Sequence, residues 1–184
     1  MTPVSKNRIG LRYGLITGLL YFILLFCRFK FFSYNPRYFV SFAVIAYLII
    51  VMMYLFTAIA RKNELGGYAD LKEIFTAVFI VILIAELSYI IFNLVYFKIV
   101  DPAFWENFRA STPIALQKTH VPEEQIEQQM KSFKEMENQS HPGNLIRGYG
   151  INVIIDSVFG LIFAIILRKR NPAIKKFFEG PKQS

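Results

Sequence analysis

Four long stretches of this sequence carry almost no charged residues, and polar segments separate them from one another. The stretches cover approximately residues 9–27, 38–60, 74–97 and 147–167. A helix needs about 20 apolar residues to cross the hydrocarbon core of a bilayer. Each stretch is too long and too weakly alternating for a strand of a membrane barrel, whereas a helix satisfies its own backbone groups in lipid. The pattern therefore predicts four transmembrane helices.

The segments between these stretches predict how the helices are joined. Asn35-Pro36-Arg37 and the Gly66-Gly67 pair are short turn signals, so the helices on either side of each turn are expected to run antiparallel. The third connection, residues 98–146, is much longer and is rich in Gln, Glu, Lys and Pro. We therefore expect an all-α fold in a single domain over residues 1–184. It is an integral membrane four-helix bundle with a helical extramembrane loop between the third and fourth spans and a basic tail at 168–184.

The long third connection carries its own helix signals. Asp101-Pro102 and Pro122-Glu123-Glu124 are typical of helix starts, with acidic side chains near the positive end of the helix dipole. The second helix is expected to run to about Asn138 and to end at His141-Pro142. Apolar residues follow helical spacing along it: Ile126, Met130, Phe133 and Met136 or Glu137. This apolar face is expected either to lie on the membrane or to cap the bundle.

Composition supports a membrane protein rather than a water-soluble one. Of the 184 residues, 54% are hydrophobic and 16% are aromatic, and the mean hydropathy is +0.39, which is high for a soluble domain. The net charge of +8 does not indicate nucleic acid, because the Lys and Arg residues flank the apolar stretches instead of forming one basic stripe. We expect the lipid bilayer as the main partner and no nucleic acid. The lone Cys27 excludes an intrachain disulfide.

The distribution of basic residues predicts the orientation in the membrane. On the side that holds both termini, Lys and Arg cluster beside the spans at residues 6–12, 61–72 and 168–182. On the other side they are fewer, and most are spread over the acid-rich loop at 98–146. Because basic flanking segments remain preferentially in the cytoplasm, both termini are expected to be cytoplasmic.

Small residues form two stripes that predict helix packing. In the first span Gly10, Gly14 and Gly18 recur at every fourth position, which leaves a groove without side chains along one helix face. A stripe of small and polar residues with the same spacing follows the last span: Gly148, Asn152, Asp156, Gly160 and Ala164. We expect these two faces to meet, with Gly160 as a packing residue on the second one.

Two acidic residues lie at membrane depth, Glu86 near the middle of the third span and Asp156 near the middle of the fourth. A charged side chain at the centre of a spanning helix costs about 2.5–3.5 kcal/mol, so such residues usually face the protein interior and find partners there. Asn93 lies two helical turns after Glu86, and Asn152 lies one turn before Asp156. Together these four residues form the candidate intramembrane polar site.

The sequence leaves two interpretations of this site open. In the functional one, Glu86 and Asp156 share or exchange a proton, as two coupled acids do, and serve a proton or cation pathway. In the structural one, both acids are held by hydrogen bonds and fix the packing of the helices. The candidate partners for such hydrogen bonds are Thr17, Tyr47, Tyr54, Asn93 and Asn152.

Other residues with chemical potential do not form a recognisable site. His120 and His141 stand alone in the loop without the spacing of metal ligands. The cluster Arg168-Lys169-Arg170 either binds anionic lipid or only marks the end of the last span. No phosphate-binding glycine loop, nucleophile elbow or zinc-protease motif occurs in the sequence. We therefore expect no enzymatic activity, no catalytic residue, no cofactor and no metal site.

Several short segments, taken in their order and spacing, resemble a known family. They are Tyr13-Gly14 with Gly18, Gly66-Gly67-Tyr68 followed by Leu71-Lys72-Glu73-Ile74-Phe75, Asp101-Pro102-Ala103-Phe104, Glu123-Glu124-Gln125-Ile126 and Leu167-Arg168-Lys169-Arg170. In these features the chain resembles, over nearly its full length, small bacterial membrane proteins grouped as domain of unknown function 4199. The resemblance implies a four-span protein of the bacterial inner membrane. It implies no established activity, cofactor or catalytic residue.

These observations lead to a ranked expectation of function. The first is a non-catalytic membrane protein with a helix-packing, scaffold or accessory role, which contacts another membrane protein or a second copy of itself. The alternative is a small proton- or ion-coupled transporter that uses Glu86 and Asp156. A further alternative is a sensor of the envelope or of lipid, in which the amphipathic loop helix moves on and off the membrane.

Overall fold

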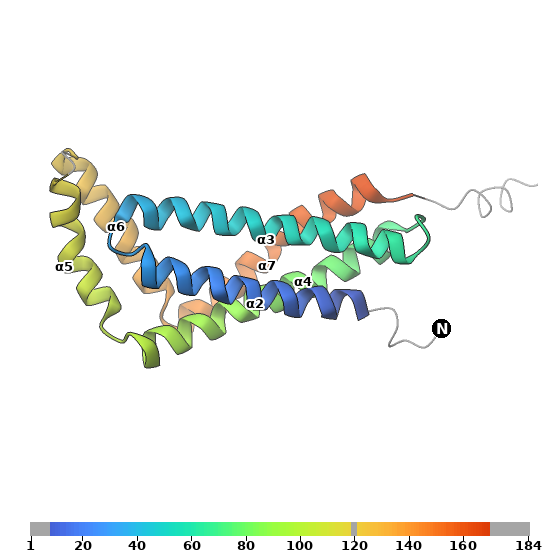
Figure 1. Ribbon diagram of the computed structural model, residues 1–184, viewed down its shortest axis with the longest axis horizontal. Helices are drawn as coiled ribbons and strands as arrows, with labels where there is room; N and C mark the ends of the chain where they lie inside the picture. Colours follow the sequence, from blue (N-terminus) through green and yellow to red (C-terminus); the bar gives the residue numbers. More distant parts are fainter. Residues whose placement is uncertain (1–7, 119–120, 170–184) are drawn as a thin grey trace, which may run out of the picture.

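The computed structural model describes residues 8–118 and 121–169 of the chain, and its named elements are all helical. They are α2 (Arg8–Phe31), α3 (Pro36–Glu64), α4 (Leu71–Val95), the π-helix η1 (Tyr96–Val100), α5 (Phe104–Gln117), α6 (Glu123–Gln139) and α7 (Pro142–Leu167). Helices α2, α3, α4 and α7 run lengthwise beside one another, and α5 and α6 lie across one end of them (Figure 1). The predicted all-α fold is confirmed.

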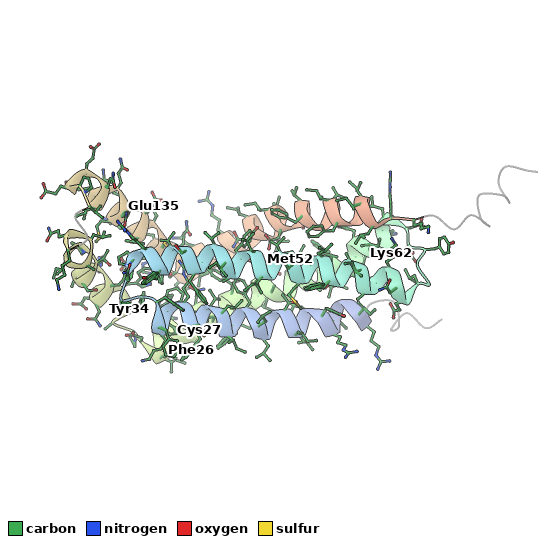
Figure 2. The ribbon with its side chains drawn as sticks, turned by 45° about the horizontal axis from the view of Figure 1, so that its top comes forward. Phe26, Cys27, Tyr34, Met52, Lys62 and Glu135 are labelled. Carbon is green, nitrogen blue, oxygen red and sulfur yellow. The ribbon has the colours of Figure 1, made fainter. Side chains whose placement is uncertain are left out.

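The four long helices have the length and composition of membrane spans, with α4 and η1 forming one of them. Their outward surfaces carry large apolar side chains that would be costly in water but are solvated by acyl chains. Leu15 of α2 is 67% exposed and Ile154 of α7 is 70% exposed. Met52 lies midway along α3, between Lys62 near the end of that helix and Tyr34 just before its start (Figure 2). The protein is therefore an integral membrane four-helix bundle.

The two short turns form as the sequence predicts. The Asn35 side chain accepts a hydrogen bond of 3.0 Å from the Arg37 N–H, and Pro36 occupies the first turn of α3, where its missing N–H costs no helical hydrogen bond. At the other end of α3, Gly66 and Gly67 have φ angles of 72° and 85°. Residues with a Cβ rarely adopt this left-handed conformation, so the glycines permit the reversal between α3 and α4.

Two boundaries in the third connection differ from the prediction. Asp101 does not start α5, because its N–H closes η1 by a 2.8 Å hydrogen bond to the Tyr96 carbonyl, and α5 begins at Phe104. Pro142 does not only end α6: it is also the first residue of α7, which begins before the predicted span start at 147. In the second case Pro142 occupies the first turn of α7, where its missing N–H costs no helical hydrogen bond.

Within the bundle α4 is the most buried span, and it contacts α2, α3 and α7. The described chain begins and ends at the same end of the bundle (Figure 1). There, Ala69 of the α3–α4 turn and Lys169 after α7 exchange two backbone hydrogen bonds of 3.0 Å. This bridge ties the turn to the end of the last span.

An aromatic cluster attaches α5 and α6 to the opposite end. Phe108 of α5 lies 5.1 Å from Phe39 of α3 and 5.0 Å from Phe133 of α6, measured between ring centroids. Phe29 of α2 is 5.1 Å from Phe104, the first residue of α5. Phe133 and Ile126, which belong to the predicted apolar face of α6, are both buried. Of the two predicted positions for this face, the structure adopts the one in which α5 and α6 cap the bundle.

The glycine stripe of the first span packs against α4 and not against the last span, so the expected contact between the two stripes is wrong. A Cβ added at Gly10 would lie 3.0 Å from the Ala77 carbonyl oxygen, and one added at Gly14 would lie 2.5 Å from Ile84. Gly18 approaches Ser88 equally closely, and Gly160 of α7 faces Val78. The glycines of the first span and Gly160 of the last span therefore pack against opposite sides of α4.

Replacing Gly10 by leucine is expected to lower the free energy of unfolding by about 1–3 kcal/mol, the usual cost of overpacking. The new side chain would meet the backbone of α4 at Ala77, which cannot move without separating the two helices. Thermal unfolding followed by circular dichroism in mild detergent measures this change. Gly150→Leu is the control, since no atom lies within 4 Å of a Cβ added there. Equal stability of the two variants would contradict the close α2–α4 contact.

Candidate functional site

Asp156 of α7 is buried and its two carboxylate oxygens are both occupied. The Tyr47 hydroxyl donates to one oxygen at 2.8 Å and the Tyr54 hydroxyl donates to the other at 2.6 Å. Both tyrosines belong to α3, where their spacing of seven residues places them on one helix face. Asp156 therefore connects the last span to the second through a pair of hydrogen bonds inside the bundle.

Glu86 of α4 is the second buried acid, with only 3% of its surface exposed. It accepts a 3.0 Å hydrogen bond from the Asn152 side-chain amide of α7. Because Asn152 lies one turn before Asp156, α7 uses adjacent positions of the same stripe to reach α4 and α3. We refer to Tyr47, Tyr54, Glu86, Asn152 and Asp156 as the polar cluster.

The cluster joins three of the four predicted site residues, Glu86, Asn152 and Asp156. The two acids are not hydrogen-bonded to each other: each is held by neutral donors. Asn93, the fourth predicted residue, donates instead to the Tyr89 carbonyl of its own helix at 2.8 Å. Of the candidate partners, Tyr47, Tyr54 and Asn152 are used. The Thr17 hydroxyl is buried without a partner among the described residues.

The surroundings of the cluster are apolar. Tyr54 belongs to a core that includes Ile50, Val81, Ile82 and Ala85, all nearly inaccessible to solvent. Hydrogen bonds are electrostatically stronger in such a medium, and an unpaired polar group there is correspondingly costly. The arrangement can hold the three spans in register. Because Asp156 and Glu86 are both buried acids with nearby hydrogen-bond donors, the cluster could also bind a proton on either carboxylate.

A cavity of about 300 Å³ lies beside the cluster at the corner between α6 and α7. Its polar lining comes from α4, from the end of α6 and from the first turns of α7: Tyr89, Gln139, Asn144, Arg147 and Asn152. Asn152 is thus shared, since it lines the cavity and also donates to Glu86. Sequence reasoning missed this cavity. Extending the α7 stripe back from Gly148 to Asn144 would have indicated one of its walls.

The histidines do not form a metal site within the described part of the chain. His141 directly precedes α7, and no group of three His, Cys, Asp or Glu side chains lies close enough to hold a metal ion there. His120 lies outside the described residues, as do Lys6 and the basic tail from Arg170 onward.

Comparison with protein families identifies the chain. The model of a family described as protein of unknown function, DUF4199, matches residues 12–169. The chain belongs to the DUF4199 family. The predicted resemblance is confirmed, and the DUF4199 match includes the polar cluster, the cavity and all but the beginning of the first span. No match was found among curated proteins or among solved structures.

Removing the Tyr54 hydroxyl is expected to weaken this DUF4199 bundle. Tyr54→Phe leaves one oxygen of a buried carboxylate without its donor, which lowers the free energy of unfolding by about 0.5–2 kcal/mol. The measurement is unfolding in detergent, followed by circular dichroism. Tyr38→Phe on the same helix is the matched control, because Tyr38 is 54% exposed. A loss as large for Tyr38→Phe as for Tyr54→Phe would remove the special role of the cluster.

Proposed function

We propose that this DUF4199 protein is a non-catalytic membrane protein with a scaffold or accessory role, in contact with another membrane protein or with a second copy of itself. The observation that supports it is the state of the two midplane acids. Asp156 is fully engaged by two hydroxyls and Glu86 by an amide, so both act as acceptors between helices. This is the structural use of buried polar groups, which fixes one helix arrangement.

The cap formed by α5 and α6 is the part best suited to a partner. Arg109 and Glu137 join the two helices by an ion pair of 3.4 Å, which supplements the aromatic cluster beneath them. The outward face of α6 mixes acidic and basic side chains, including exposed Glu127, Lys131 and Glu135. The apolar residues Ile126 and Phe133 of α6 are buried inside the cap. This face is therefore not available to bind the membrane surface as the sensor hypothesis requires.

The proposed location is the bacterial inner membrane, with both termini in the cytoplasm. The end of the bundle that holds the start of α2, the α3–α4 turn and the end of α7 has basic residues in every connection. Within the described chain these are Arg8, Arg12, Arg61, Lys62, Lys72, Arg168 and Lys169. Positively charged flanks favour the cytoplasmic side, which leaves the cap on the outer side.

Cysteine labelling is expected to show this orientation. In a Cys27→Ser background, Glu135→Cys should react with a membrane-impermeant maleimide in intact spheroplasts, because its side chain is exposed on the cap and the proposed orientation puts the cap outside. Asn63→Cys, exposed near the α3–α4 turn, should react only after the membrane is permeabilised. Both sites lie in polar regions, so each serves as the control of the other. The reverse pattern would place both termini outside.

A second candidate function is a small proton- or ion-coupled transporter that uses Glu86 and Asp156. It is favoured by the cavity, which reaches Asn152 and so brings a polar space to the residue that holds Glu86. In a transporter, intramembrane acids line a path for the ion. Neither acid belongs to the lining of this cavity, which is why the scaffold role is proposed first.

Proteoliposomes separate the two functions. If the protein is a scaffold, vesicles containing it should lose an imposed proton gradient no faster than protein-free vesicles, and Glu86→Gln and Asp156→Asn should change nothing. A pH-sensitive dye inside the vesicles reports the gradient, and Thr76→Val, outside the cluster, is the control substitution. A leak in the parent that both acid variants abolish, but that the control retains, would establish the transporter instead.

A further inference from the structure

The cavity between α4, α6 and α7 has the features of a binding site beside the polar cluster, with which it shares Asn152. Its volume of about 300 Å³ is comparable to that of small-molecule sites. Tyr89, Gln139, Asn144 and Arg147 supply a hydroxyl, two carboxamides and a guanidinium to its wall. Gln139, Asn144 and Arg147 are exposed and Tyr89 is half-buried, so a ligand can reach these groups from outside the bundle. Asn144 also donates a 2.9 Å hydrogen bond to the Asn138 carbonyl, which holds its side chain in place.

The charge of the lining indicates an anion. Arg147 is its one charged member among the described residues, and no described carboxylate forms an ion pair with it. Asn144 and Leu145 lie in the first turn of α7, where the helix dipole adds partial positive charge. Glu86 does not line the cavity, and its carboxylate accepts a hydrogen bond from the Asn152 amide. A guanidinium beside amide donors is well matched to phosphate oxygens.

The surface that continues from the cavity indicates where such an anion comes from. Ile151 lines the cavity and is also 50% exposed on the outside of α7. Farther along the same helix, Ile155 and Val158 are exposed by 51% and 54%. Polar lining therefore passes directly into an apolar track on a membrane span, which is the arrangement that a lipid headgroup and its acyl chain require.

We propose that this cavity binds the phosphate of an anionic phospholipid, with Arg147 as its main contact and the acyl chain along the exposed face of α7. The same phosphate chemistry is offered by a soluble phosphate ester. The apolar track favours the lipid. This inference does not depend on whether the bundle is a scaffold or a transporter.

Binding of phosphatidylglycerol to the purified full-length protein in nonionic detergent tests the proposal. Native mass spectrometry counts the bound lipid, with phosphatidylcholine as the zwitterionic comparison. Arg147→Gln should weaken phosphatidylglycerol binding about tenfold, because it removes a charge-assisted contact. Gly148→Leu should weaken it similarly without altering charge: a Cβ at Gly148 meets no atom within 4 Å, and the longer side chain fills the cavity.

Lys98→Gln is the matched control, since Lys98 is an exposed basic residue at the same end of the bundle but outside the cavity lining. Its binding should equal that of the parent, and all variants should show unchanged thermal unfolding. If Lys98→Gln and Arg147→Gln lost the same amount of phosphatidylglycerol binding, the effect would come from general surface charge and the proposal would be overturned. The proposal would also be overturned if Arg147→Gln and Gly148→Leu bound the lipid as well as the parent protein does. Displacement of the lipid by millimolar glycerol 3-phosphate would retain the phosphate site but overturn the lipid as its source.

Discussion

A carboxyl group buried between helices in a bilayer has no water to bind and must find its hydrogen-bond donors within the protein. Here α3 supplies two tyrosine hydroxyls to Asp156, and α7 supplies the Asn152 amide to Glu86. These contacts fix which faces of α3, α4 and α7 point inward. The apolar residues on the remaining faces are left to lipid, so a few polar atoms determine the orientation of three long helices.

Close backbone approach provides the second constraint. Lipid tails solvate leucine and isoleucine as well as another helix does, and spans therefore associate through tight packing rather than through exclusion of water. Gly10, Gly14 and Gly18 bring α2 against α4, and Gly160 brings α7 against its other side. The aromatic cluster then closes one end of the bundle. Its rings come from both spanning and cap helices, which makes the cap part of the same folded unit.

Local signals predicted much of this structure. The four spans follow from charge-free length, and the turns at Pro36 and at Gly66-Gly67 follow from residues with special backbone preferences. The neighbours of each span were not predictable in the same way. Small residues indicate which face of a helix packs closely, but they do not indicate which other helix it contacts. For this reason the prediction that the stripes of α2 and α7 meet is wrong.

The candidate site likewise contains features that local sequence signals predict and features that they do not. Its two acids were recognisable because carboxylates are rare at membrane depth, and Tyr47, Tyr54 and Asn152 were among several possible partners. Which of these partners reach the two acids depends on how the helices are rotated relative to one another, and the sequence does not show that rotation. The cavity was not foreseen because its walls come from positions as distant in sequence as Tyr89 and Arg147. No local sequence pattern shows that two residues so far apart in the chain lie close together in space.

The inward direction of the glycine groove also limits how this protein can assemble. Motifs of small residues are the usual means by which spanning helices dimerise, but here Gly10, Gly14 and Gly18 are already covered by α4 of the same chain. Most of the span surface left for a neighbouring copy carries bulky side chains such as Leu15 and Ile154, and acyl chains solvate these equally well. The uncovered glycines of α7, which are Gly143, Gly148 and Gly150, all lie in its first half, so the span surface open to close contact with another helix lies toward the cap.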